Sequence, residues 1–251
     1  MKLSMLRPLE GWRAFAGEVG VVVLGVLLAL GAQEVAESID DRGEAAATRD
    51  SLANEIEESL AVLELRKAAQ PCIDKRLKEL RAIVNQWGRT GSFETPRWVS
   101  QATWFAFDTA RFEAAQSAGR LALLPSEEQY RFGLVVESLR SFRDIQKRET
   151  DAWSTLRMLQ SGPEVLSESD RTAVRVALQD ASTLNHFAQI SVGQTLPQAA
   201  AFGWRPDMRR VQERMGLAWK DGKFRPSVCI SIDTPPDQAH REANLIYPLP
   251  E

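Results

Sequence analysis

The sequence predicts an all-α protein: one N-terminal transmembrane helix, an antiparallel bundle of four to five helices, and a short irregular C-terminal tail. Three observations support this prediction. A long apolar run lies near the N-terminus, apolar residues recur at helical spacing through most of the remaining chain, and only one short segment has a strand pattern. The 251 residues suffice for a buried core, and 44% hydrophobic with 26% charged residues is an ordinary globular composition.

The apolar run, residues 14–32, is the expected membrane anchor, and Glu18 is its only charged residue. Its length corresponds to a helix of about 28 Å, close to the roughly 30 Å hydrocarbon core of a bilayer. Three basic residues and one acidic residue precede the run, whereas five acidic residues and one arginine follow it before residue 45. Because basic flanks remain in the cytoplasm, we expect residues 1–13 to be cytoplasmic and the body to be exported.

Two alternatives to a retained anchor are open at this stage. Residues 19–30 have the length of a signal-peptide core, and Ala29, Leu30 and Gly31 form an acceptable small-residue cleavage site. The run could also be a buried helix of a soluble protein. A retained anchor and a cleaved signal peptide both export the body.

Glu18 lies about one helical turn inside the predicted span. Its carboxylate either reaches the lipid headgroups or is protonated in place, or it makes a polar contact with a partner helix. Gly25 and Ala29, spaced i and i+4, would let such a helix approach closely. Glu18, Gly25 and Ala29 are therefore the candidate residues for membrane-helix packing.

After the anchor, residues 33–51 are acidic and rich in alanine and predict a solvated helical stalk. Residues 52–219 form the predicted bundle domain, and residues 220–251 an extended tail. The bundle residues expected to point inward recur at helical spacing: Leu52, Ile56, Leu60, Leu63, Ile73, Leu77, Leu80, Val84, Trp87, Tyr130, Leu134, Val135, Leu139, Phe142, Ile145, Trp153, Leu156, Val174, Leu178, Ala181, Leu184 and Phe187.

Several residues mark expected boundaries within the body. Pro71 should kink or restart its helix, and residues 88–96 predict a loop. A helix is expected to start near Trp98 and to end at Gly119, and the next helix to open with a capping box of Ser126 and Gln129. Ser169 should cap the helix after that, and Pro197 should lie in a loose region. A short helix over residues 207–219 and a strand over residues 228–232 complete the prediction.

No residue constellation specifies a chemistry. His186 and His240 are far apart and lack neighbouring ligands, so no metal site is predicted, and we expect His186 near the inward face of its helix. Nucleophile, zinc-protease, phosphate-loop and dinucleotide motifs are absent from the sequence, so we predict no catalytic residues, no cofactor and no enzymatic activity. The net charge of −3 without a polybasic block argues against a nucleic-acid partner.

Cys72 and Cys229 are the two cysteines of the chain. In an exported protein they can form one disulfide, which would tie the tail to the bundle. Two buried free thiols are the alternative.

Four aromatic residues gather in a short stretch: Trp98, Trp104, Phe105 and Phe107. Aromatic residues at helical spacing are core residues in most proteins, and a ligand pocket is the less common use. We therefore treat these four residues as a weak candidate for a ligand-binding pocket.

Two segments together resemble a family pattern. Residues 17–30 (GEVGVVVLGVLLAL) begin with a glutamate and contain glycines, and residues 115–124 (AQSAGRLALL) follow about ninety residues later. The chain resembles an uncharacterised group of bacterial proteins with a Glu-started, Gly-containing N-terminal membrane anchor and a helical exported domain. This resemblance covers roughly the first 160 residues and implies a bacterial inner membrane location with a periplasmic body; it brings no activity.

The sequence therefore favours a non-enzymatic protein-interaction or structural module of the bacterial envelope. Its expected partners are the membrane and either an envelope protein or a second copy of the chain. Two alternatives are a sensory or small-ligand-binding bundle and an accessory subunit of a larger membrane complex. A closed apolar pocket near Trp104 would favour ligand binding, and an exposed apolar patch on the body would favour contact with a protein.

Overall fold

The computed structural model describes residues 11–100, 109–215 and 226–244. These residues contain no β-strand, which confirms the all-α prediction. The helices are α1 (Gly11–Thr90), α2 (Ala110–Ser117), α3 (Ser126–Leu156), α4 (Glu168–Ala201), α5 (Met208–Met215) and α6 (Pro236–Asn244), with 3₁₀ turns at Arg120–Leu123, Arg157–Ser161 and Ser227–Cys229.

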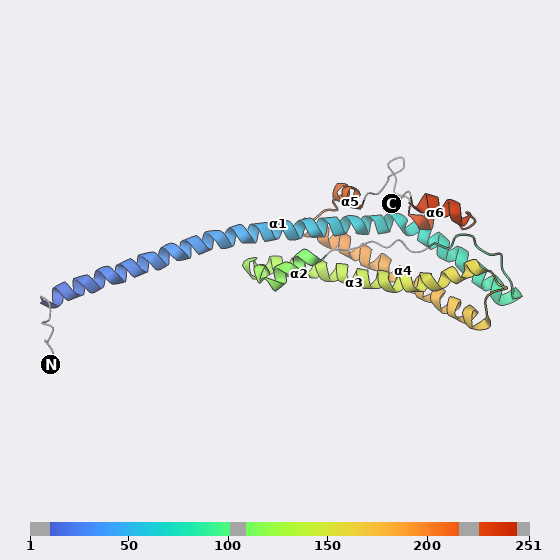
Figure 1. The fold of residues 1–251 in the computed structure, drawn as a ribbon, viewed down its shortest axis with the longest axis horizontal. Helices are drawn as coiled ribbons and strands as arrows, with labels where there is room; N and C mark the ends of the chain where they lie inside the picture. Colours follow the sequence, from blue (N-terminus) through green and yellow to red (C-terminus); the bar gives the residue numbers. More distant parts are fainter. Residues whose placement is uncertain (1–10, 101–108, 216–225, 245–251) are drawn as a thin grey trace, which may run out of the picture.

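Helix α1 is 80 residues long, or about 120 Å, and its N-terminal half extends far beyond the body (Figure 1). The predicted anchor, the predicted stalk and the first bundle segment are thus parts of one continuous helix. Pro71 lies inside α1 without interrupting it, so the helix does not restart there. Proline removes one backbone hydrogen bond and weakens the helix locally; Figure 1 shows α1 changing direction in its C-terminal part.

Helices α1 and α3 lie side by side and run in the same direction. Arg49 contacts Glu128 near the start of α3, and Arg66, farther along α1, contacts Glu149 near the end of α3. The chain returns from the end of α1 to the start of α2 before α3 begins, which makes the parallel arrangement possible (Figure 1). The sequence predicted an antiparallel bundle, whereas in the structure α1 and α3 run parallel.

Helix α4 runs antiparallel to α1. Arg66 contacts Asn185, whereas Arg81, later in α1, contacts Ser182, which comes earlier in α4. Helices α3 and α4 also share an extensive interface. The three long helices α1, α3 and α4 therefore form the bundle, and α2, α5 and α6 pack around it.

Two clusters of buried apolar side chains fill the bundle. The first joins the middle of α1 to α2, α3, the end of α4 and α5, and includes Leu52, Ile56, Leu60, Leu63, Val135, Leu139, Phe142 and Val211. The second joins the end of α1 to the end of α3 and the start of α4, and includes Ile73, Leu77, Leu80, Val84, Trp87, Trp153, Leu156, Val174, Leu178 and Ala181. Burying one such large side chain stabilises the fold by about 1.5–3 kcal/mol.

Three residues expected to point inward are exposed: Tyr130 at the start of α3, and His186 and Phe187 on α4. In each case the buried stripe of the helix covers fewer positions than the sequence pattern predicted, so these residues lie outside it. Asn185 and Ala188 fill the core-facing positions of α4 on either side of His186 and Phe187.

The capping predictions fail at both helices for the same reason, a shift of the helix start. Ser126 is the first residue of α3 rather than its cap, and Gln129 donates from Nε2 to the carbonyl of Leu124. In α4 the capping box is formed by Ser167 with Asp170 instead of by Ser169. The predicted helix end at Gly119 is confirmed, because this residue has φ +73 directly after α2.

Further predictions in the loops and the C-terminal region differ from the structure in several details. Residues 91–100 are not helical, so the helix expected near Trp98 does not begin within this described stretch, and Pro197 lies within α4. The short helix expected over 207–219 is α5 (Met208–Met215), and residues 216–219 lie outside the described part. Residues 228–232 form a 3₁₀ turn and its continuation instead of a strand, since no strand among the described residues offers a ladder of hydrogen bonds. The predicted extended tail contains a helix, α6.

Candidate functional site

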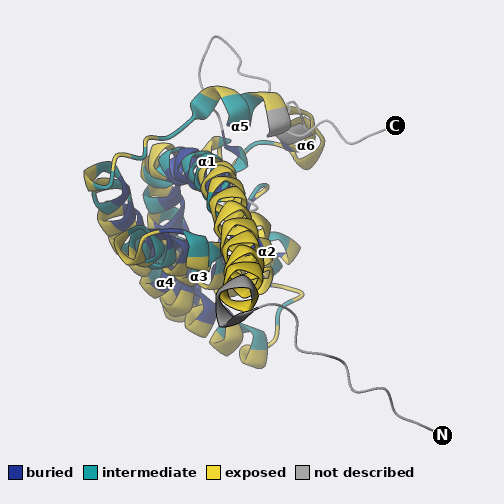
Figure 2. Ribbon diagram, turned by 90° about the vertical axis from the view of Figure 1, so that its left-hand side faces the viewer, coloured by how far each residue is buried: buried dark blue, intermediate teal, exposed yellow. Residues whose placement is uncertain are grey.

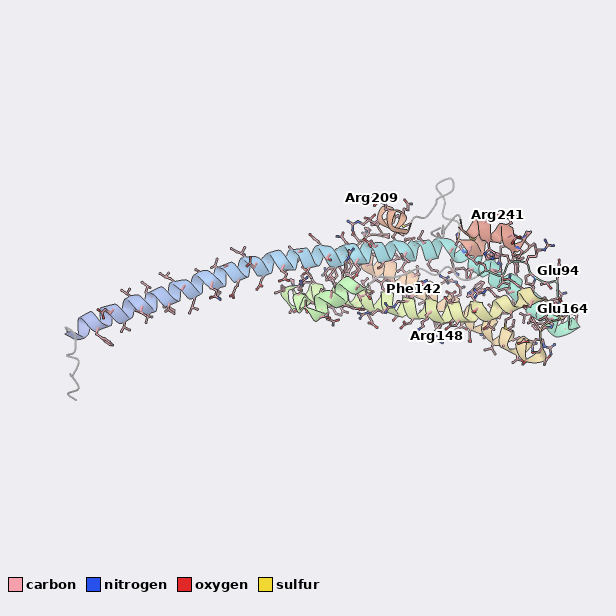
Figure 3. The ribbon with its side chains drawn as sticks, in the orientation of Figure 1. Glu94, Phe142, Arg148, Glu164, Arg209 and Arg241 are labelled. Atoms are coloured by element: carbon pink, nitrogen blue, oxygen red, sulfur yellow. A yellow bond between two sulfur atoms is a disulfide. The ribbon has the colours of Figure 1, made fainter. Side chains whose placement is uncertain are left out.

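The N-terminal part of α1 presents apolar side chains that no other part of the described chain covers. An 18-residue window there has a mean hydropathy of 2.2 and none of it is buried. By length and composition this helix could span a membrane, a test that a signal sequence near the N-terminus also passes. Figure 2 shows the exposed helix projecting from the body, and Figure 3 shows its side chains extending away from the bundle. The zero burial counts against the alternative of a core helix in a soluble protein.

The three candidate packing residues Glu18, Gly25 and Ala29 all lie on this exposed helix. A Cβ atom added to Gly25 would have no neighbouring atom within 4 Å. Packing within the described chain therefore gives no reason for a small residue at this position. The structure places the three residues on α1, and no helix among the described residues packs against them.

The structure joins Cys72 of α1 to Cys229 in a disulfide, with the Cα atoms 4.9 Å apart. One helical turn after Cys72, the buried guanidinium of Arg76 donates from Nη1 to the carbonyls of Trp98 (2.6 Å) and Val99 (2.7 Å). Its Nη2 donates to the carbonyl of Ile230. Burial lowers the pKa of Arg76, while its contact with a carboxylate of α1 opposes this change. We call this assembly of the disulfide, Arg76 and residues 97–100 and 226–232 the C-terminal clasp.

Trp98, the one described member of the aromatic pocket candidate, belongs to the clasp. Its backbone N–H donates to the carbonyl of Ile232 (2.8 Å), its indole Nε1–H donates to the carbonyl of Ser227 (3.2 Å), and its ring meets His240 of α6 edge to face at 5.0 Å. The ring thus attaches the C-terminal segment to the bundle. Residues 104, 105 and 107, the other members, lie outside the described residues.

A second polar cluster is buried between the three long helices. Arg66 Nη2 donates to Glu149 Oε1 (3.0 Å) and to Asn185 Oδ1 (2.9 Å). Asn185 Nδ2 in turn donates to Asp74 Oδ1 at 2.9 Å. The side chains of Arg66 and Glu149 are each only 1% exposed. The cluster is therefore closed to a substrate, and it fixes the register of α1, α3 and α4.

This cluster was not predicted from the sequence, although a signal was present. Arg66 continues the apolar stripe that includes Leu63 and Ala69, and Glu149 lies between Phe142 and Trp153 on the stripe of α3. A charged residue at a core position on each of two helices indicates a buried ion pair. Two nitrogens of Arg66, Nε and Nη1, are buried without a hydrogen-bond partner among the described residues. The guanidinium consequently depends on Glu149 for charge compensation.

Burial raises the pKa of the Glu149 carboxyl above its ordinary value of 4.5, and attraction to Arg66 offsets this only in part. The folded state then binds the proton more tightly than the unfolded state. Stability should therefore fall as the pH rises from about 4.5 through the folded pKa. Glu149→Gln removes this titration, so the stability of the wild type relative to the variant should decline over that window. Urea unfolding of both proteins between pH 4.5 and 7 tests the expectation; a difference that stays constant or rises with pH would contradict it.

The grooves on the described surface are open and bordered by charged side chains. One of about 490 Å³ lies between α3 and α4 and is bordered by Arg148, Asp151 and Asp180. Figure 3 shows Arg148 on the outer side of α3, whereas the buried Phe142 faces α1. Another groove, of about 350 Å³, lies where Leu123 approaches the acidic stalk. Among the described residues, no three His, Cys, Asp or Glu side chains are grouped so as to hold a metal ion.

No protein-family model, curated protein or solved structure matches this chain. Functional inference therefore rests on its own residues and their geometry.

Proposed function

We propose that the protein is a non-enzymatic module of the bacterial envelope. Residues 14–32 of α1 anchor it in the inner membrane, the N-terminus is cytoplasmic, and the helical body lies in the periplasm. The module acts through contact with another envelope protein or with a second copy of itself. The observation that carries this proposal is the apolar part of α1, which is wholly exposed yet continuous with a helix of the bundle.

Two further features support the orientation. Basic residues precede the apolar segment and acidic residues follow it, as expected when the N-terminal side remains in the cytoplasm. The disulfide between Cys72 and Cys229 fits an oxidising compartment such as the periplasm.

Contact is proposed rather than catalysis because of where the polar groups lie. The best organised charged cluster, around Arg66 and Glu149, is closed to solvent. The apolar surface of α1, in contrast, is left exposed by the rest of the described chain. Such a surface on a monomer is typical of a membrane or protein contact.

The test is the behaviour of the full chain in bacterial membranes. We expect the mature protein to keep residues 1–32 by intact mass, to resist alkaline carbonate extraction, and to lose its body to protease added outside spheroplasts. Leu24→Arg with Leu27→Arg should release it, because each arginine in a span costs about 2.5–3.5 kcal/mol. As a matched control, Val165→Arg with Val176→Arg, at exposed apolar sites of the body, should leave it in the membrane. A chain beginning near residue 31, or carbonate release of the wild type, would refute the proposal.

A further inference from the structure

Two large apolar residues are exposed on α1 beyond the predicted membrane span. Val35 is 60% exposed and Ile39 is 61% exposed, within a segment otherwise dominated by acidic residues and alanine. They lie past the length of helix that a bilayer covers, and the body does not cover them either. Membrane insertion therefore leaves these two side chains unexplained.

Val35 and Ile39 continue a stripe that begins inside the membrane. Residues on this stripe follow one another at alternating steps of four and three, the repeat of a left-handed coiled coil: Val21, Gly25, Leu28, Ala32, Val35 and Ile39. We call these six residues the α1 seam. The small residues Gly25 and Ala32 lie between larger ones in the membrane part of the seam, which allows two helices to approach closely there.

The charged residues of the stalk are placed so that they would not oppose contact along the seam. The acidic residues of the stalk, Glu34, Glu37, Asp40, Asp41 and Glu44, all lie off the seam. The positions that flank the seam at the end of the anchor and in the stalk are occupied by small residues, namely Gly31, Ala36, Ser38 and Gly43. Two stalks that meet along the seam would thus direct their like charges outward, where water and ions screen them.

The body leaves the seam accessible. It packs against the stalk through Ala45 and Thr48, which are half-buried and buried. It also pairs Arg120 with Glu44 and borders the half-buried Ser38 across an open groove. At about 100° per residue, Val35 and Ile39 point roughly 130° away from that side of the helix. A second helix can therefore lie along the seam without meeting the bundle.

We propose that a second copy of this chain binds along the α1 seam as a parallel helix pair, spanning the membrane and the first part of the stalk. This inference rests on the proposed function, because anchoring in one membrane with one orientation places two copies parallel and at the same height. A homotypic pair then brings each seam residue opposite its own counterpart. Glu18, seven residues before Gly25, lies in line with the seam, so the pair also brings the two Glu18 side chains together.

Single-cysteine crosslinking in native membranes tests the pair. Both native cysteines are bonded to each other, so an introduced cysteine is the only free thiol. Val35→Cys and Ile39→Cys should give, on mild oxidation, a disulfide-linked species of twice the 28.0 kDa chain mass. Glu37→Cys and Asp40→Cys, exposed positions off the seam, are the matched controls and should give several-fold less.

A second variant separates pairing from random collision. In the Ile39→Cys background, Val35→Glu places two like charges in the pair and should lower the dimer several-fold, whereas Glu37→Gln should not. Equal crosslinking on and off the seam, monomer alone, or an adduct of another mass would each overturn the inference. Carbonate extraction of the same variants keeps the two proposals distinct. If the chain stays in the membrane but forms no dimer, only the pairing along the seam is refuted. If carbonate extracts the chain, the membrane anchor is refuted.

Discussion

Replacing Glu149 by leucine is expected to destabilise the fold by about 3–5 kcal/mol, because it leaves the guanidinium of Arg66 buried without its counter-charge. Arg66 is 1% exposed, and two of its nitrogens have no hydrogen-bond partner among the described residues. Asn185 would remain as an acceptor, but a neutral amide does not balance a buried cation. Urea unfolding of the full chain in detergent, followed by circular dichroism, measures the loss.

The double variant Arg66→Met with Glu149→Leu should recover most of that stability. Removing both charges abolishes the desolvation cost that also raises the pKa of Glu149, and apolar side chains of similar volume can fill the site. The matched control is Glu127→Gln, which breaks the exposed pair of Arg131 with Glu127 and should cost less than about 1 kcal/mol. A double variant as unstable as Glu149→Leu would show that the cluster contributes more than its charges.

Removing the disulfide with Cys72→Ser and Cys229→Ser is expected to cost about 2–5 kcal/mol, because the bond closes a loop across 157 residues of sequence. The chain-entropy model alone gives about 5 kcal/mol for such a loop. The segment it holds has little core of its own: Val228 is buried and Ile232 is partly buried. Thermal unfolding of the full chain with and without reductant measures the effect.

The loss should also be visible locally. Hydrogen exchange of residues 226–244 should accelerate more than that of α3, because the clasp then depends on Arg76 and a few backbone hydrogen bonds. The double serine variant serves as the control for the reductant, which should not change its melting temperature. An unchanged melting temperature on reducing the wild type would mean that those hydrogen bonds alone hold the segment.

Much of the fold could be predicted because helical periodicity is a local signal. Residues such as Leu52, Ile56 and Leu60 are buried as their spacing indicates. Exceptions arose where a stripe is narrow or a helix start shifts by a residue or two. Phe187 lies beside the buried stripe of α4, and Ser167 caps that helix two residues before the predicted cap. Local patterns constrain such details only weakly.

Some features of the candidate sites could likewise be predicted from the sequence, and others could not. The apolar segment and the pairing of two cysteines follow from composition, so both were expected from the sequence. The path of residues 226–232 was not, because alternating Val and Ile residues form a strand only beside another strand. Here the partners are the carbonyl-binding guanidinium of Arg76 and the indole of Trp98, which come from distant parts of the chain.

The sequence by itself determined the helical class, the apolar run of α1 with its flanking charges, and the cysteines available for a bond. These are properties of single segments and of composition. Only the tertiary structure decided that α1 is one continuous helix running parallel to α3, that Arg66, Glu149 and Asn185 meet, and that the side of the stalk carrying Val35 and Ile39 faces away from the body. Each of these depends on which surfaces come together when the helices pack. Local spacing places Arg66 and Glu149 on buried stripes, but it does not show that these two residues, 83 positions apart, meet.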